Sequence, residues 1–193
     1  MGSFAAVVLA AGASRRFGAD NKLLVPIRGA PLVRGVAQAA VESGASEVLI
    51  VTGYDRPRIE EALRRLEVRF VDNPQWEAGM GTSVSAGIAA LGHEVEAALI
   101  IPGDMPRITA SVLAALVRAF RAAPGEPIVY AAAPDGEQRN PVLWPRRLFP
   151  QLMALAGHHG AKPILQRQIA NSLAVPLPVE TFVDIDTAAD LEN

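Results

Sequence analysis

Residues 5–18 read AAVVLAAGASRRFG, an apolar run of strand length that leads directly into a glycine-containing loop. The apolar part, Ala5 to Leu9, has the length of a buried strand. After it, small residues let the backbone approach a ligand closely, and exposed N–H groups in such a loop can hold a phosphate group. The alternative is an ordinary strand-to-helix turn whose arginines are solvated. The stretch therefore predicts the first strand of a sheet and makes the end of that strand the first place to look for a ligand.

Further apolar runs of strand length follow, and segments with helical spacing separate most of them. The predicted strands are 48–51, 68–71, 97–101 and 128–132, and the predicted helices have apolar faces within 33–41, 59–66 and 112–120. This alternation indicates βαβ units, and hence a three-layer α/β fold with a mostly parallel sheet and helices on both faces. Ligands of such open sheets bind beyond the carboxyl ends of the strands.

The last third of the chain departs from the simple alternation. We expect short strands at 139–143, 173–177 and 182–185, and helical segments at 148–155 and 161–169. A length of 193 residues suits one domain. We therefore interpret residues 1–193 as a single domain whose last third is an elaboration of the first part.

Composition excludes several classes of function. A formal net charge of −2 argues against a nucleic-acid surface, and the absence of cysteine excludes disulfides, thiolate catalysis and cysteine-ligated metals. The apolar run Phe4 to Ala11 precedes the arginines, which is the reverse of a secretory signal, and it is too short to span a bilayer. We expect a soluble, cytoplasmic protein with no nucleic-acid and no membrane partner.

A single carboxylate follows the most apolar predicted strand. Residues 97–106 read AALIIPGDMP, so Asp104 stands in a Pro-Gly turn at the carboxyl edge of the sheet. A carboxylate combined with substrate phosphates suits Mg²⁺, and Mn²⁺ is the alternative metal. The alternative role is that of a turn aspartate that hydrogen-bonds its own backbone.

Two further segments carry polar groups at the ends of predicted elements. Residues 72–87 read DNPQWEAGMGTSVSAG, where Thr82 or Ser83 can cap a helix whose N-terminus faces an anion or a base, plain capping being the alternative. Residues 182–191 read FVDIDTAADL, which places Asp184 and Asp186 on one face if the strand continues. Either aspartate can add a second ligand to a metal held by Asp104, whereas Thr187 and Asp190 are better explained as helix-capping residues.

Four motifs together resemble those of the MobA-like NTP transferases. The residues LAAGASRRFG at 9–18, with KLL at 22–24, resemble the signature loop of that family, GDMP at 103–106 resembles its Gly-Asp-x-Pro motif, and DIDT at 184–187 resembles its terminal motif. The segment 72–87 is also similar to a segment of the family that holds base and ribose. Within the family, Leu-Ala-Ala-Gly is typical of the CTP-using, MocA-like enzymes, whereas the GTP-using enzymes usually have Leu-Ala-Gly-Gly.

The resemblance, which runs from Val7 to Leu191, implies a Rossmann-like nucleotidyltransferase fold and the transfer of a nucleotide. CMP would pass from CTP to a phosphorylated acceptor, a molybdopterin (molybdenum cofactor), with release of pyrophosphate, and a molybdoenzyme would receive the product. Residues 1–106 would form the nucleotide-binding half and residues 107–193 the acceptor-side and closing half. The implied catalytic residues are Arg16, Lys22 and Asp104. The implied nucleotide contacts are Leu9, Ala10, Ala11, Gly12, Arg16, Lys22, Gly81, Ser83 and Asp104; the metal ligands are Asp104 and Asp186; and the acceptor contacts are Asn140 and Lys162.

One acceptor-side motif departs from the family. Where MocA-like enzymes usually read Gly-Asp-x-Gly-Ala-Arg, residues 157–162 read GHHGAK, so His158 replaces the aspartate and Lys162 the arginine. Lysine keeps the charge but loses the bidentate fork of arginine. We interpret His158 and His159 as a solvated loop. The alternatives are a related transferase that uses GTP or another phosphorylated acceptor, and a non-catalytic protein that delivers molybdenum cofactor to an enzyme of the xanthine dehydrogenase type.

Overall fold

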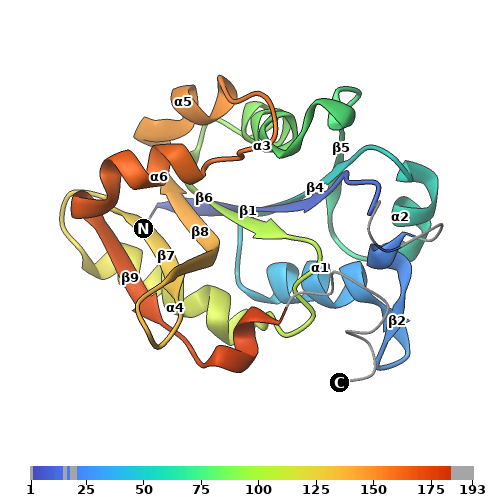
Figure 1. The fold of residues 1–193 in the computed structure, drawn as a ribbon, viewed down its shortest axis with the longest axis horizontal. Helices are drawn as coiled ribbons and strands as arrows, with labels where there is room; N and C mark the ends of the chain where they lie inside the picture. The colour runs from blue at the N-terminus through green and yellow to red at the C-terminus, as the bar shows by residue number, and fades with distance from the viewer. Residues whose placement is uncertain (1, 15–16, 18–20, 184–193) are drawn as a thin grey trace.

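A seven-stranded sheet forms the middle layer of the computed structural model, which describes residues 2–14, 17 and 21–183. The strand order is β5-β4-β1-β6-β8-β7-β9 (Figure 1). A separate small hairpin joins β2 (Pro26–Ile27) and β3 (Ala30–Pro31). The strands of the large sheet are β1 (Ser3–Ala10), β4 (Glu47–Thr52), β5 (Arg69–Asp72), β6 (Val95–Pro102), β7 (Ile128–Ala132), β8 (Gln138–Pro145) and β9 (Ser172–Pro176).

The sheet is mostly parallel, as the sequence predicts. The central strand β1 pairs in parallel with both β4 and β6, and β4 pairs in parallel with β5. On the other side, β8 is antiparallel to both β6 and β7, so that β7 and β9 again run in the direction of β1. The carboxyl ends of β1, β4 and β6 therefore meet at one edge of the sheet.

Helices cover both faces of the sheet (Figure 1). One face carries α1 (Leu32–Glu42), α2 (Arg56–Ala62) and α4 (Ala110–Ala122), and the other carries α3 (Met80–Ala89), α5 (Phe149–Met153) and α6 (Lys162–Gln168). The short 3₁₀ helices are η1 (Lys22–Leu24), η2 (Trp76–Ala78), η3 (Arg146–Leu148), η4 (Ile169–Asn171) and η5 (Val179–Phe182). The three-layer α/β architecture expected from the alternating pattern is confirmed.

The buried strand β1 supplies side chains to the cores on both faces. Ala6 and Val8 belong to the apolar cluster under α1, α2 and α4, whereas Ala5 and Val7 belong to clusters on the α3 side. Successive side chains of a strand point to opposite faces, so a strand covered on both sides reads as one continuous apolar run. Contact with α3 is close, because a Cβ on Gly87 would lie 2.5 Å from Val7 Cγ1.

Two of the predicted elements have other limits or another conformation. Phe182, predicted to begin a strand, is the last residue of the 3₁₀ helix η5, and the continuation from 184 lies outside the described residues. The helix predicted over 59–66 ends earlier, because α2 stops at Ala62 and Arg65 has a φ of 73°. A non-glycine residue with positive φ cannot continue an α-helix, so the apolar spacing of this segment extends beyond the helix itself.

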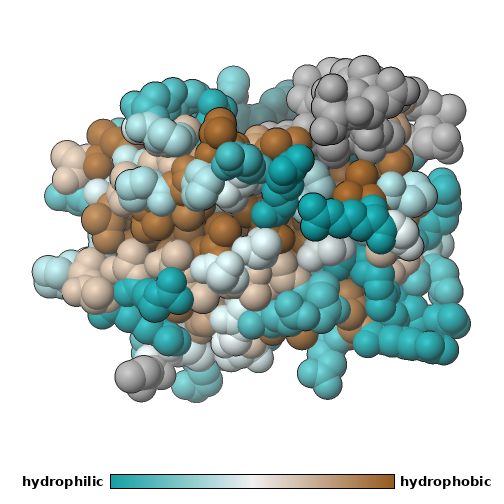
Figure 2. Space-filling model, turned by 90° about the horizontal axis from the view of Figure 1, so that it is seen from below, coloured by the Kyte–Doolittle hydropathy of each residue, from teal (hydrophilic) through white to brown (hydrophobic). Residues whose placement is uncertain are grey.

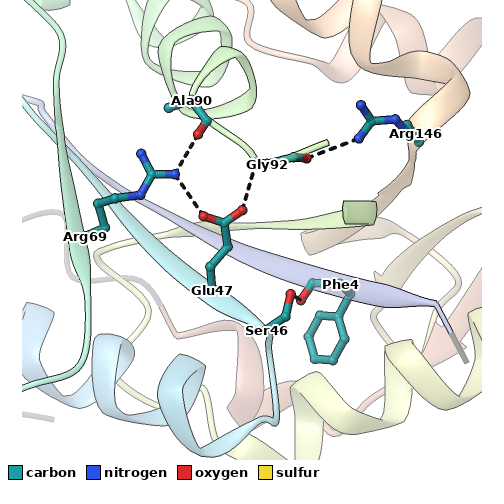
Figure 3. A network of polar contacts seen from close by, with 7 residues as sticks. All are labelled: Phe4, Ser46, Glu47, Arg69, Ala90, Gly92 and Arg146. Carbon is teal, nitrogen blue, oxygen red and sulfur yellow. Dashed lines mark hydrogen bonds and ion pairs between the residues drawn. The ribbon is translucent and has the colours of Figure 1, made fainter. Parts of the chain in front are cut away.

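Polar contacts tie together the amino ends of neighbouring strands, at the edge opposite to the carboxyl ends (Figure 3). Glu47 at the start of β4 accepts from Arg69 Nη2 at 2.8 Å and from the Gly92 amide at 3.0 Å. Arg69 also donates to the Ala90 carbonyl at 2.6 Å, and Arg146 donates to Gly92 at 3.3 Å. The network connects β4, β5 and the turn before β6. It therefore stabilises the arrangement of these strands and has no contact with the described residues at their carboxyl ends.

Seen from below the view of Figure 1, apolar residues gather toward the left and centre of the surface, and hydrophilic residues are most dense on the right (Figure 2). A cavity of about 600 Å³ is bounded by the N-terminal ends of α1 and α4 and by η5. Of the predicted nucleotide, metal and acceptor contacts that belong to the described residues, none lines this cavity. Within the described part of the chain, no helix is both long and apolar enough to cross a membrane.

Candidate active site

A cavity of about 450 Å³ lies at the carboxyl ends of β1 and β6. One wall is the glycine loop after β1, another is the turn after β6, and a third is formed by η2 and the start of α3. Its lining residues are Leu9, Ala11, Gly12, Ala13, Ser14, Lys22, Leu23, Trp76, Glu77, Gly79, Met80, Ser83, Pro102, Gly103, Asp104 and His158. The cavity lies where an open α/β sheet binds its ligands.

Close packing of two backbones brings Asp104 beside the glycine loop. Leu9 is paired with Pro102 in the parallel β1–β6 ladder, and the Gly103 amide then donates to the Leu9 carbonyl at 3.0 Å. A Cβ on Gly103 would lie 2.7 Å from that carbonyl oxygen, a contact that real side chains do not make. The glycine of the Pro-Gly turn is therefore required for the approach of the two loops, and Asp104 follows directly.

Lys22 and Asp104 form an ion pair in the cavity. The Lys22 ammonium lies 2.6 Å from Asp104 Oδ2, and the two side chains are 14% and 24% exposed. Lys22 begins η1, whose N-cap Asn21 accepts from the Leu23 amide at 3.1 Å through its side-chain oxygen. Asn21 is itself 2% exposed, so its packing fixes the position from which Lys22 reaches across to the turn after β6.

The cavity offers one aspartate carboxylate to a metal ion. Asp104 lines it, and within the described ranges no group of three or more His, Asp or Glu side chains could hold a metal. Mg²⁺ is commonly held by one or two carboxylates together with substrate phosphates, so this donor set fits a metal that arrives with a nucleotide. The predicted second ligand, Asp186, and the predicted phosphate contact, Arg16, lie outside the described residues.

A buried asparagine that the sequence analysis did not select organises the start of α3. Asn73, directly after β5, is 2% exposed and donates to Thr82 Oγ1 at 2.9 Å and to Ser83 Oγ at 3.0 Å. Thr82 in turn donates to the Gly79 carbonyl at 2.8 Å. These contacts orient Ser83, which lines the cavity. A polar residue directly after a predicted strand is a sequence signal for such a role. The sequence does not show its hydrogen-bond partners, because they lie nine and ten residues further along the chain.

Gly81 has a packing role in the structure. Its amide donates to the Gly157 carbonyl at 2.8 Å, and a Cβ at this position would lie 2.8 Å from the Ala156 carbonyl oxygen. Gly81 is absent from the lining of the cavity. The loop between α5 and α6 thus rests on the first turn of α3, and Figure 1 shows α5 beside α3 on the same face of the sheet.

The structure brings most of the predicted nucleotide contacts together. Predicted residues that line the cavity are Leu9, Ala11, Gly12, Lys22, Ser83 and Asp104. Ala10 and Gly81 do not line it, and neither do the predicted acceptor contacts Asn140 in β8 and Lys162 at the start of α6, both of which are exposed. Six of the residues predicted to contact the nucleotide therefore lie around one cavity. Their contacts with a nucleotide, like the acceptor contacts, stay predictions.

Several lining residues were not among the predicted contacts, and two of them are the aromatic residue Trp76 and the titratable residue His158. Trp76 lines the cavity and packs so closely on the residue after β4 that a Cβ on Gly53 would lie 2.7 Å from Trp76 Cβ. The ring of Tyr54 meets Trp76 edge-on, with ring centroids 5.4 Å apart. His158 is exposed and also lines the cavity. The interpretation of this loop as solvated is therefore incomplete.

Comparison with known proteins gives the family and the fold. Residues 6–172 match the model of the MobA-like NTP transferase domain. The chain is 35% identical over 115 residues to nicotine blue oxidoreductase of Paenarthrobacter nicotinovorans, covering 60% of this chain and 56% of that protein. It also spans 27% of the length of the bifunctional protein GlmU of Geotalea uraniireducens.

Solved structures of low identity share the fold. A nucleotidyl transferase from Methanothermobacter thermautotroptrophicus superposes with a TM-score of 0.81 at 24% identity, covering 97% of this chain and 94% of that one. Rv0371C of Mycobacterium tuberculosis, solved in complex with manganese, has a TM-score of 0.80 at 20% identity, covering 99% and 96%. Since the family model matches most of the residues, from β1 to the start of β9, the chain belongs to the MobA-like NTP transferase family.

Proposed function

We propose that this protein transfers CMP from CTP to a phosphorylated acceptor of the molybdopterin type and releases pyrophosphate. The observation that carries the proposal is the Lys22–Asp104 pair, 2.6 Å apart, which faces a glycine loop inside the cavity of a MobA-like chain. A cation and a carboxylate at this edge of the sheet are what a triphosphate and its metal ion require. The balance of the reaction is simple: a phosphate oxygen of the acceptor bonds to the α-phosphorus, and the bond from that phosphorus to the β-phosphate oxygen breaks.

Each part of the cavity has a task in this reaction. The backbone of Ala11 and Gly12 supports the nucleotide, and Lys22, with Arg16, neutralises charge on the leaving pyrophosphate. Asp104 and Asp186 would hold Mg²⁺ or Mn²⁺, which supplies positive charge to the phosphate oxygens when bound. The protein contributes positioning and charge, and no covalent intermediate with a side chain is needed.

The choice of CTP rests on Ala11. This residue is 3% exposed, lines the cavity and is held by a hydrogen bond from the Tyr54 amide to its carbonyl at 3.1 Å. A methyl group fixed at this position leaves less room for a purine than a glycine would. The mass of the product formed with each nucleotide tests this choice directly.

A second candidate function is the reduction of a substrate related to nicotine blue. The observation that favours it is the 35% identity over 115 residues to nicotine blue oxidoreductase. The Lys22–Asp104 pair in the cavity favours phosphoryl chemistry instead. The two functions differ in their co-substrates, an NTP in one case and an electron donor such as NADH or NADPH in the other.

One experiment separates the candidates. The protein is incubated with molybdopterin, Mg²⁺ and each of the four NTPs in turn; products are identified by mass, and pyrophosphate is quantified. CTP-dependent pyrophosphate release with a cytidylylated acceptor is the expected result. Pyrophosphate release with GTP alone points to the related transferase. Absence of turnover with all four NTPs, together with molybdopterin that stays bound to the protein on gel filtration, points to the accessory protein. Oxidation of NADH or NADPH by nicotine blue, without any nucleotide transfer, would overturn the proposal in favour of the oxidoreductase.

A further inference from the structure

The side-chain oxygen of Asn21 connects two segments of the cavity wall. Asn21 Oδ1 accepts from the Leu23 amide at 3.1 Å, as the N-cap of η1, and from the Ser14 hydroxyl at 3.3 Å. A carboxamide oxygen has two lone pairs, so it can accept both hydrogen bonds at once. Ser14, Lys22 and Leu23 all line the cavity. A side chain that is itself 2% exposed therefore joins the glycine loop to the turn that begins with Lys22.

Ser14 has a backbone conformation that serine seldom adopts. Its φ is 51°, in the left-handed region, and its carbonyl accepts from the Phe17 amide at 2.7 Å. Such a conformation persists where surrounding contacts hold it, because it is less stable than an extended or helical one. The hydrogen bond from the Ser14 hydroxyl to Asn21 is a contact of this kind. Asn21 therefore helps to define the course of the glycine loop where the loop meets the cavity.

Lys22 depends on the other hydrogen bond of Asn21. The cap on the Leu23 amide fixes the turn that Lys22 begins. From this turn, the Lys22 ammonium lies 2.6 Å from Asp104 Oδ2. Lysine carries a compact charge on a flexible four-carbon chain, so its side chain does not by itself fix where the charge lies. The backbone position that Asn21 stabilises therefore limits which groups the ammonium can reach.

The amide nitrogen of Asn21 has no corresponding task. Nδ2 is buried, and within the described structure it has no hydrogen-bond partner. A buried donor without a partner lowers stability. An apolar side chain of similar size would avoid this loss, but it would leave both the Leu23 amide and the Ser14 hydroxyl without their acceptor. The contribution of Asn21 is thus carried by its oxygen.

We propose that Asn21 is a positioning residue that couples the glycine loop at Ser14 to the turn of Lys22, so that loop and ammonium are placed together against the triphosphate of CTP. This inference rests on the proposed function, because it takes the cavity to hold a nucleotide. The two hydrogen bonds can be separated by mutation. Asn21→Ser still caps η1, since serine is an effective N-cap, but its oxygen lies one bond closer to the backbone and no longer reaches Ser14. Asn21→Ala removes both hydrogen bonds.

Kinetics with CTP and molybdopterin test the link to the loop. Asn21→Ser and Ser14→Ala should each raise the KM for CTP about 5-fold with kcat unchanged, the effect of one hydrogen bond. The double variant should show the same increase and not about 25-fold, because both changes remove the same hydrogen bond. Asn21→Ala should also lower kcat, since it loses the cap that places Lys22. Thr109→Ala is the matched control and should keep both constants, because Thr109 caps α4 through the Val112 amide at 3.4 Å and lies outside this cavity. An unchanged KM in Asn21→Ser, or a double variant whose effects multiply, would overturn the proposal.

A measurement without nucleotide tests the placement of Lys22. The chain has two lysines, Lys22, whose side chain is 14% exposed, and the exposed Lys162, so acetylation by acetic anhydride followed by mass spectrometry reports each of them separately. Asn21→Ala should raise the acetylation rate of Lys22 relative to that of Lys162, because the ion pair with Asp104 is no longer held by the capped turn. Asn21→Ser and Thr109→Ala should leave the ratio unchanged. An unchanged ratio in Asn21→Ala refutes the positioning of Lys22, whereas a raised ratio in a protein that does not turn over CTP refutes only the proposed reaction.

Discussion

At the scale of single residues, the main feature of the cavity is the ion pair between Lys22 and Asp104. Asp104 and Lys22 approach to 2.6 Å because a glycine precedes the aspartate and a capped 3₁₀ turn begins with the lysine. The pair is mostly buried, which strengthens its interaction relative to a pair in water. Residue-scale changes should therefore alter turnover far more than stability where a side chain faces the cavity.

Asp104→Asn should lower kcat by about 10²-fold or more while the protein stays folded, because the uncharged amide no longer provides the anionic oxygen that a divalent metal and Lys22 require. Pyrophosphate release and circular dichroism are the measurements. Asp72→Asn is the matched control, since Asp72 also ends a parallel strand and pairs with an arginine, Arg56, at 3.5 Å, but lies outside the cavity lining. Near-normal turnover in folded Asp104→Asn would remove the metal assignment.

Ala11→Gly should weaken the preference for CTP over GTP. Removal of one methyl group beside the base changes discrimination by about 1–3 kcal/mol, which is a modest effect. The measurement is the ratio of kcat/KM for the two nucleotides in wild type and variant. Ala13→Gly, in the same loop and also lining the cavity, serves as the comparison and should shift the ratio less. An unchanged ratio in Ala11→Gly would move the search for the base contact to Ser83 and Trp76.

At the scale of elements, α3 links the sheet, the cavity and the acceptor-side loop. It packs on β1 at Gly87, and Asn73, directly after β5, donates hydrogen bonds to its first turn. Its Gly81 amide donates a hydrogen bond to the Gly157 carbonyl in the loop after α5. A small residue at each contact lets the helix approach its neighbours closely. Because α3 packs on the sheet and on this loop, it fixes where Ser83 and His158 lie relative to the sheet, although the two residues come from different parts of the chain.

Gly87→Ala should destabilise the protein by about 1–3 kcal/mol, because the new methyl group would lie 2.5 Å from Val7 Cγ1 and 2.9 Å from Val51 Cγ2 in a buried contact. Gly35→Ala is the control, since a methyl group on this exposed glycine in the N-terminal half of α1 would meet no atom of another element within 4 Å. That control should gain about 0.5–1 kcal/mol from helix propensity. Urea unfolding measures both variants, and a loss of stability in both, or in neither, would contradict the close packing of α3 on β1.

At the scale of the whole molecule, the two edges of the sheet have separate roles. The carboxyl edge holds the cavity, and the amino edge holds the network around Glu47, Arg69 and Gly92 (Figure 3). Because the network is partly exposed, its ionic contribution is small and depends on salt. Stability and activity should therefore be separable by mutation at opposite edges.

Glu47→Gln should cost no more than about 1 kcal/mol and leave kcat unchanged, because the amide can still accept from Gly92 but loses its charge toward Arg69, whose side chain is 52% exposed. Urea unfolding at low and high salt, with pyrophosphate release measured alongside, gives both quantities. The difference from wild type should shrink at high salt. A drop in kcat without a loss of stability would mean that the two edges are coupled.

The sequence by itself determined most of the elements and which residues from β1 to β6 meet around the candidate site. Continuous apolar runs predicted β1, β6 and β7, because strands buried on both faces need no polar alternation. The positions of Gly12 and Asp104 just after predicted strands, and of Lys22 further along after the glycine loop, followed from local order along the chain, and the structure brings the three residues to one cavity. Local patterns were sufficient here because each of these residues is placed by the strand directly before it or by its own turn.

Only the tertiary structure decided the rest. The insertion of β8 between β6 and β7 depends on the antiparallel pairing of β8 with β6, a strand distant in the sequence, which periodicity does not record. Asn73 orients Ser83 through a hydrogen bond to a residue ten positions later in the chain. His158 lines the cavity because the loop after α5 packs on Gly79 and Gly81 at the start of α3. A pair of histidines in a glycine-containing loop is interpreted as solvated from sequence. The place of His158 is set by backbone contacts between its loop and residues more than seventy positions away.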